Sequence, residues 1–266
     1  MDSLVPWEAH LEVWVLIFGV ISIGWYMVRV LEPKAVEAGY TPITRSQKIF
    51  FLLASVLLWV VSDWPVHEIA ETRLYFVHML QHLMISMIIP ALYLISTPKW
   101  LFDLFFDESK KGWQILKRIS KPLFAGILFN TVTLLLHWAW IVDVSAEYGA
   151  VHFGLHFLIF MSGILMWMPV IGPVEQWQLS PIGKCIYLFA MSIIPTVPGG
   201  WLVFAEQVVY RHYDTPERLW GIDVITDQQA AGVVMKLLGG FFLWGVIVTI
   251  FFKWANTEMK KDSEFQ

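Results

Sequence analysis

The chain has 266 residues, of which 57% are hydrophobic and only 15% are charged, and its mean hydropathy is +0.61. A soluble domain of this length carries more polar residues, so the composition excludes that class and indicates a membrane protein. The formal net charge of −4 also argues against nucleic acid as a partner.

Seven stretches of about 20 apolar residues, each long enough to cross ~30 Å of hydrocarbon as a helix, recur along the chain. They lie near residues 11–30, 48–66, 75–96, 122–143, 150–171, 184–205 and 228–252. The first stretch should remain in the protein, because no basic segment precedes it and no small-residue cleavage site follows it. No repeat or shift of composition marks a boundary. We therefore predict an all-α, polytopic bundle of seven transmembrane helices, with residues 1–266 as a single domain.

The basic residues predict the orientation of this bundle, because loops rich in lysine and arginine stay in the cytoplasm. Of the 18 Lys and Arg residues, fourteen lie in or beside the segments joining spans 1 and 2, 3 and 4, and 5 and 6, or in the C-terminal tail. The opposite side holds only Arg73, Arg211 and Arg218, while Lys236 lies inside the seventh span. We expect the N-terminus outside and the C-terminus in the cytoplasm.

Three local features add detail to these spans. The longest inner loop, TPKWLFDLFFDESKKGWQILKRISKP, is typical either of a helix in the headgroup layer or of a charged loop anchored by tryptophans. Pro195 and Pro198, followed by two glycines, predict a break in the sixth span. Thr226 and Gln229 have the spacing of a capping box at the start of the seventh helix.

The eight histidines all fall in the outer half of the predicted topology. His10, His67 and His212 lie outside the spans, where histidine is common at an interface. The other five are His78 and His82 in span 3, His137 in span 4, and His152 and His156 in span 5. The deepest two, His82 and His156, lie roughly 10 Å below the outer boundary at 1.5 Å per residue. The five imidazoles should therefore share one layer.

The spacing within HMLQH and HFGLH puts two imidazoles on one face of each helix. We expect the two pairs to face each other. On the fourth span Asn130, Thr133 and His137 form a polar stripe, which should face the bundle interior because lipid would penalise it.

A single membrane histidine is usually a hydrogen-bonded packing residue, but five at one depth favour a metal site. Imidazole suits copper, zinc and iron, and nearby thioethers would favour Cu(I). The candidate metal ligands are His78, His82, His137, His152 and His156. The candidates for orienting these ligands are Gln81, Asn130, Asp227, Gln228 and Met235. Cys185 is the only cysteine, so any metal site must use other ligands.

The stretch DQQAAGVVMK begins the seventh span with further polar side chains. Asp227 either stabilises the helix N-terminus electrostatically or, with Gln228, lines the mouth of the histidine layer. Met235 lies about two turns deeper. The long side chain of Lys236 is expected to carry its ammonium to the outer interface.

The chain resembles the CtaG family of membrane proteins, which assist assembly of the caa3-type cytochrome c oxidase. The resemblance rests on HMLQHLMISMIIPALYLISTP, on HWAWIVD followed by HFGLHFLIFMSGILMWMPVIGP, and on DQQAAGVVMK. It covers roughly residues 60–240. The chain departs from the family pattern at Leu155, where an acidic residue is usual, and at Lys236, where a tryptophan is usual. The missing acid would remove a partner that orients a ligating imidazole.

The resemblance implies a multi-pass protein of the bacterial plasma membrane, with cytochrome c oxidase subunits and the lipid bilayer as partners. We predict an assembly factor that binds and delivers copper, as Cu(I), and is not an enzyme. An alternative is a redox protein in which the same histidines ligate a b-type haem. A retinal photoreceptor using Lys236 is disfavoured, because span 3 offers no carboxylate as counter-ion.

Overall fold

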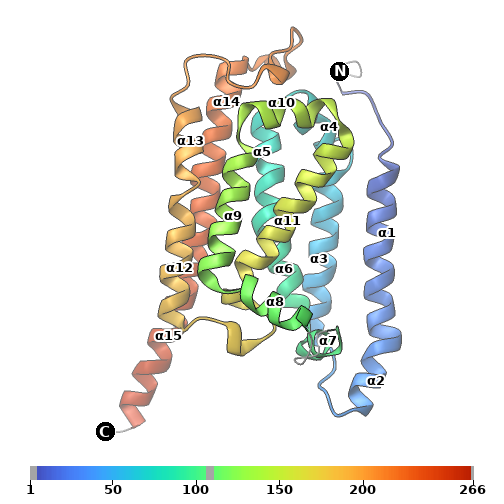
Figure 1. Cartoon of the computed structure of the whole chain (residues 1–266), viewed down its shortest axis with the longest axis vertical. Helices are drawn as coiled ribbons and strands as arrows, with labels where there is room; N and C mark the ends of the chain where they lie inside the picture. Colours follow the sequence, from blue (N-terminus) through green and yellow to red (C-terminus); the bar gives the residue numbers. More distant parts are fainter. Residues whose placement is uncertain (1–4, 106–110, 265–266) are drawn as a thin grey trace.

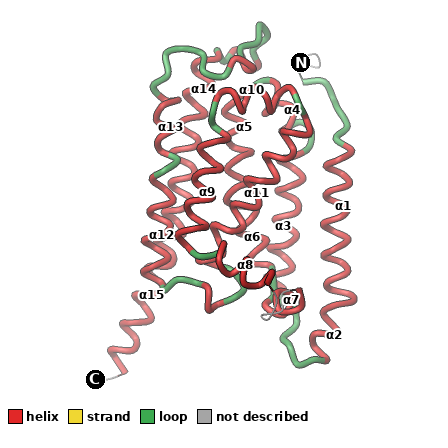
Figure 2. The backbone as a smooth tube through the Cα atoms, viewed as in Figure 1, coloured by secondary structure: helices red, strands yellow, loops and turns green. Residues whose placement is uncertain are grey.

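The computed structural model describes residues 5–105 and 111–264, and every regular element within these residues is a helix (Figures 1 and 2). The predicted all-α, polytopic class is confirmed. The long helices run side by side, with α4 (Val66–Thr72) and α10 (Ala139–Glu147) at the end where α1 begins (Figure 1). The helices α7 (Lys99–Phe105) and α8 (Lys111–Ile119) lie at the opposite end. We call these the histidine end and the basic end.

Six described helical stretches are long and apolar enough to cross a membrane. The first joins α1 (Leu11–Tyr26), η1 (Met27–Leu31) and α2 (Glu32–Glu37), and the second is α3 (Arg45–Ser62). The next two are α5 (Tyr75–Leu83) with η2 (Met84–Ile88) and α6 (Ile89–Ser96), and the single helix α11 (Gly149–Ile171). The last two are α12 (Pro181–Ile193) with α13 (Thr196–Val203), and α14 (Val224–Val233) with η6 (Val234–Leu238) and α15 (Gly239–Glu264). Short 3₁₀ turns complete the described chain at η3 (Glu175–Trp177), η4 (Arg211–Tyr213) and η5 (Leu219–Gly221).

The fourth predicted span is shorter than expected. Its helix, α9 (Pro122–Leu136), has 15 residues and is bent by 70° from α8. The chain turns at His137 and Trp138, and α10 then runs across the histidine end (Figure 1). The described residues give seven spans if the α8–α9 pair counts as one, but the predicted end at residue 143 was wrong. The sequence did not reveal this turn, because the residues before it, LLL, and after it, AWIV, are all apolar.

The third and fifth spans approach each other closely beneath their histidines. A Cβ atom added at Gly163 on α11 would lie 2.1 Å from the carbonyl oxygen of Ser86 in η2. Trp167 Nε1 donates a hydrogen bond of 2.8 Å to the carbonyl oxygen of Met87 in the same π-helical segment. Only a glycine permits this backbone contact. It fixes the distance at which α5 and α11 present their side chains.

The sixth and seventh spans depart from straight helices in two ways. The predicted break is confirmed, because α12 ends at Ile193 and α13 starts at Thr196, beyond Pro195. The predicted capping box of Thr226 and Gln229 was wrong. The helix starts earlier, at Val224, and the carboxylate of Asp223 accepts the backbone N–H groups of Ile225 and Thr226.

The inner loop contains two helices, α7 and α8, as one of the two interpretations of its sequence expected. Both lie near the basic end of the bundle (Figure 1). Part of the loop, residues 106–110, lies outside the described residues.

Candidate metal centre

Two histidine pairs, one on α5 and one on α11, meet at the histidine end of the bundle. Along each helix the paired rings are neighbours, with centroids 4.2 Å apart for His78 and His82 and 4.1 Å apart for His152 and His156. Between the helices, His82 Nε2 lies 3.1 Å from His156 Nε2. The structure therefore brings the two predicted pairs face to face.

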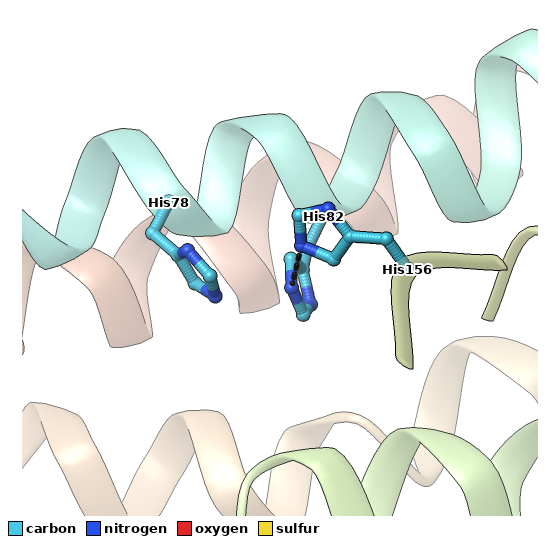
Figure 3. Close-up of side chains that lie close together, drawn as sticks. All are labelled: His78, His82 and His156. Carbon is cyan, nitrogen blue, oxygen red and sulfur yellow. Dashed lines mark hydrogen bonds between the residues drawn. The ribbon is translucent and has the colours of Figure 1, made fainter. Parts of the chain in front are cut away.

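Three of these imidazoles form a compact triad, which we call the inner triad: His78, His82 and His156 (Figure 3). Each offers one ring nitrogen, and these nitrogens lie within 4.8 Å of one another. His78 and His82 are 6% and 8% exposed. His82 Nδ1 is buried without a hydrogen-bond partner among the described residues. A buried, unsatisfied nitrogen costs free energy, and metal binding is one way to use the lone pairs of such a cluster.

A carboxylate enters the cluster from α4, which the sequence did not predict. Glu71 Oε1 lies 3.1 Å from His78 Nδ1 and 3.1 Å from His152 Nε2. The hydrogen bond with His78 fixes the tautomer of that imidazole and leaves its other nitrogen for a metal. Glu71 thus supplies a carboxylate to the cluster, although Leu155 stands where the resemblance led us to expect an acid.

His67, also on α4, joins the same cluster, although we interpreted it as an interfacial residue. Its Nδ1 lies 4.0 Å from Glu71 Oε1 and accepts a hydrogen bond of 3.0 Å from Gln81 Nε2. Its ring is 5.7 Å from that of His152. His67, Glu71 and His152 place one donor atom each within 4.8 Å of one another, and we call them the outer triad. The sequence signal was the H-x₃-E spacing directly before span 3.

The pKa values of His67 and Glu71, both on α4, are shifted from their usual values. Burial lowers the pKa of His67 to about 4, and the nearby charge of Glu71 only partly opposes this effect. Burial would raise the pKa of Glu71, but its contacts with His78 and His152 outweigh that effect and hold the pKa well below its usual value. Near neutral pH the cluster thus contains a neutral His67 beside a carboxylate.

Contacts with the loop after α13 hold α4 in this position. His212 Nε2 lies 2.7 Å from the carbonyl oxygen of Glu71, and the hydroxyl of Tyr213 donates to the carbonyl oxygen of Ala70 at 2.8 Å. His212 and Tyr213 both lie more than a hundred residues after α4 in the sequence. The geometry of the cluster therefore depends on this loop.

The fifth predicted ligand, His137, lies beside the inner triad without being part of it. Its ring centroid is 6.3 Å from that of His82. Its Nδ1 contacts the carbonyl oxygen of Thr133, and its Nε2 lies 3.3 Å from Met79 Sδ. Both ring nitrogens therefore already have partners.

Two of the predicted orienting residues contact other groups. Gln81 donates to the carbonyl oxygen of Val61 at 2.7 Å and to His67 Nδ1 at 3.0 Å, and His67 belongs to the other side of the cluster. Asn130 Nδ2 donates to the carbonyl oxygen of Gly126 and contacts Met191 Sδ, on the side of α12. The polar stripe on the fourth span is buried as expected, but Asn130 does not reach the imidazoles.

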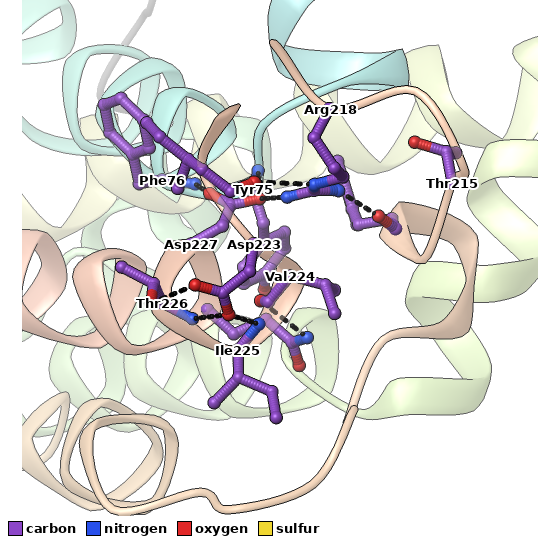
Figure 4. Close-up of polar contacts among 12 residues, drawn as sticks. Tyr75, Phe76, Thr215, Arg218, Asp223, Val224, Ile225, Thr226 and Asp227 are labelled. Carbon is purple, nitrogen blue, oxygen red and sulfur yellow. Dashed lines mark hydrogen bonds and ion pairs between the residues drawn. The ribbon is translucent and has the colours of Figure 1, made fainter. Parts of the chain in front are cut away.

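Asp227 (Figure 4) and Gln228 both connect helices and loops at the histidine end. Asp227, fully buried, accepts the backbone N–H groups of Tyr75 and Phe76 at 2.9 Å each and pairs with Arg218 at 3.2 Å. It therefore caps the N-terminus of α5 and not that of its own helix. Gln228 Oε1 accepts from the backbone N–H of Val209 at 2.8 Å.

Met235 and Lys236 line a small cavity of about 50 Å³ that also borders His82, His137 and Met79. Lys236 Nζ donates to the hydroxyl of Thr196, at the break between α12 and α13. The ammonium thus has a hydroxyl partner at the helix break, and its extension to the outer interface stays a prediction.

The sequence model of the cytochrome c oxidase caa3 assembly factor family, Caa3_CtaG, matches residues 24–257, nearly the whole chain. The chain belongs to this family. The predicted resemblance is thereby confirmed, and the match includes every residue of both triads. No match was found among curated proteins or among solved structures.

Membership of Caa3_CtaG makes the chain an assembly factor for a caa3-type cytochrome c oxidase. The role of this family fits a non-catalytic protein that interacts with oxidase components. The apolar helices fit a protein embedded in a lipid bilayer.

Proposed function

We propose that this assembly factor binds copper as cargo, as Cu(I), at His78, His82 and His156, and delivers it to the oxidase at the outer face of the bacterial plasma membrane. The observation that carries the proposal is the inner triad, whose three nitrogens lie within 4.8 Å of one another. Three convergent nitrogens at this separation need only small side-chain shifts to share one ion.

The ligand set and its surroundings favour Cu(I) over a divalent ion. Imidazole and thioether ligands suit Cu(I). Met79 Sδ contacts His137, whose ring lies 6.3 Å from that of His82. Three neutral imidazoles leave the bound ion with its full charge, and burying a single charge costs less than burying two. Glu71, bonded to His78 Nδ1, orients that ring and offsets the charge of the ion.

The proposal requires one orientation of the protein in the membrane, with the histidine end outside. The N-terminal α1 begins at the histidine end, whereas α15 ends at the basic end (Figure 1). The lysine and arginine count predicts that the basic end faces the cytoplasm. Single cysteines at Asp214 and Lys260, in a Cys185→Ser background, test this arrangement in intact cells. A membrane-impermeant maleimide should label position 214 and spare position 260, and the reverse pattern would refute delivery at the outer face.

The copper proposal is tested by Cu(I) affinity, measured by competition with a chromophoric chelator on purified protein. His82→Ala and His156→Ala each remove one of three ligands. Each should lower the affinity by more than the ~10- to 100-fold typical of changes in groups that only orient a ligand. Leu83→Ala, one residue along α5, controls for general destabilisation. Oxidase copper content in cells carrying each variant should fall in parallel.

If His82→Ala and His156→Ala fold normally, bind Cu(I) like the parent and support full oxidase activity, the inner triad is a packing feature and the proposal is wrong. Leu83→Ala removes no ligand, so its Cu(I) affinity shows how much a change in packing alone contributes.

The alternative, a b-type haem held between spans 3 and 5, has less support. His82 Nε2 and His156 Nε2 are in direct contact at 3.1 Å, which leaves no space for a porphyrin plane between them. A Soret band in the purified protein would favour this alternative over the copper proposal.

A further inference from the structure

The outer triad differs from the inner triad in its chemistry. It combines two imidazoles, from His67 and His152, with the carboxylate of Glu71. A carboxylate with two imidazoles is a common ligand set for Zn²⁺, and it also suits Cu²⁺. With a divalent ion such a set leaves one net charge, the same as Cu(I) on three neutral imidazoles. Each triad therefore suits a different ion.

The outer triad is also more accessible than the inner one. The side chains of His67, Glu71 and His152 are 19%, 18% and 13% exposed. Two of these residues, His67 and His152, line a groove of about 660 Å³ whose other walls come from α1, α3, η2, α6 and α11. His156 is the one member of the inner triad that also lines this groove. A cation can reach the outer triad through this groove, whereas most of the inner triad lies deeper among packed helices.

The positions of the three residues on their helices support a common site. His67 and Glu71 are four residues apart and project from one face of α4, whereas His152 comes from the first turn of α11. A cation held by all three would link α4 to α11 across the groove. Glu71, 3.1 Å from His152 Nε2, already connects the two helices, and a bound ion would add His67 to that connection.

We propose that His67, Glu71 and His152 form a second cation site, with ligands other than those of the copper site, which takes a divalent ion of the Zn²⁺ and Cu²⁺ class from the groove beside α1. The side chain of Gln81 competes with the ion for His67 Nδ1. Its amide donates to His67 Nδ1, so an ion at that nitrogen displaces a hydrogen bond of 3.0 Å. Glu71 is shared, because the oxygen that would bind the ion also contacts His78 in the inner triad.

The test measures Zn²⁺ stoichiometry and affinity on the full-length protein in detergent, by competition with a chromophoric chelator. Zn²⁺ can also bind three imidazoles, so the measurement is made in a His82→Ala background, which disrupts the inner triad. In that background we expect one tight Zn²⁺ equivalent. Adding His67→Ala or His152→Ala should lower its affinity by more than about 100-fold, since each removes a ligand. His137→Ala, which removes an imidazole from neither triad, should leave it unchanged.

Cu(I) affinity, measured on the same variants, separates this site from the copper proposal. His67→Ala in the otherwise unchanged protein should keep Cu(I) binding and lose one Zn²⁺ equivalent. Equal Zn²⁺ binding with and without His67 and His152 would overturn the second site, whatever the Cu(I) result. A His82→Ala protein that keeps its Cu(I) affinity would refute the copper proposal alone.

Discussion

Two buried polar groups of residues lie at the same end of this bundle and differ in how fully their atoms are bonded. Around Asp227, both carboxylate oxygens accept backbone N–H groups, and Arg218 adds a charged donor (Figure 4). In the histidine cluster, by contrast, His82 Nδ1 has no partner among the described residues, and one oxygen of Glu71 lies beside two imidazoles.

This difference separates a structural role from a binding role. A saturated network has no lone pair to offer a ligand, and its contribution is to hold helices in place. An undersaturated cluster carries the cost of burial without full compensation, and such sites are associated with binding. Variants of the first network should therefore affect folding, whereas variants of the cluster should affect metal binding.

The largest effect is expected at Asp227. Replacing it by alanine removes the carboxylate partner of Arg218, which keeps only backbone carbonyl partners, and leaves two N–H groups of α5 uncapped. Asp227→Ala should therefore lower the free energy of unfolding by about 3–5 kcal/mol. The measurement is denaturant unfolding in detergent micelles. Asp223→Ala removes the exposed cap of α14 and serves as the matched control, with a clearly smaller loss. Comparable losses of stability for the two aspartates would show that the buried Asp227 network has no special structural role.

The close crossing of α5–η2 with α11 can be broken at Gly163. The added methyl of Gly163→Ala meets the Ser86 carbonyl oxygen, so the helices must separate, at a cost of about 1–3 kcal/mol in unfolding free energy. Cu(I) affinity should fall as well, because His82 and His156 move apart. Gly154→Ala on the same helix has no atom within 4 Å of the new methyl and should be neutral or stabilising. If both variants behave alike, the crossing does not set the geometry of the cluster.

Much of this arrangement follows from sequence periodicity. Two histidines four residues apart on each of two apolar helices were enough to predict that the pairs share a depth and face inward. Those relations are local to one helix, or follow from span order and length. The predicted break at Pro195 belongs to the same kind of inference, since proline acts on its own helix.

The contribution of α4 could not be predicted in this way. Glu71 and His67 lie in a short helix between spans, and their position depends on His212 and Tyr213, which lie in a distant loop. The role of Asp227 was missed for a similar reason, because it caps α5, a helix about 150 residues away in sequence. Local patterns identify which residues can be polar and buried, but not which partner reaches them.

A smaller effect is expected from Glu71→Gln, which keeps the shape of the side chain and removes its charge. Because Glu71 orients His78 without belonging to the inner triad, Cu(I) affinity should fall by about 10- to 100-fold, with little loss of stability. Glu68→Gln makes the same charge change on the same helix, where the carboxylate contacts Thr72, and should leave Cu(I) affinity unaltered. Equal effects at both positions would indicate a general charge effect in place of the contact with His78.

The smallest effect is expected from Lys236→Met. The ammonium has a hydroxyl partner in Thr196, so the lysine belongs with the bonded, structural residues although it borders the same small cavity as His82. Methionine is close in length and is tolerated in apolar helices, so unfolding free energy should change by no more than about 1 kcal/mol, the net worth of one hydrogen bond. Cu(I) affinity should stay at the parent value, because a positive charge does not help a cation to bind.

Thr196→Val removes the same hydrogen bond by replacing its other partner, and its unfolding free energy should match that of Lys236→Met. A large loss of Cu(I) affinity in Lys236→Met alone would show that the lysine orders the metal site. Having bonded polar atoms would then not distinguish structural residues from metal-binding ones.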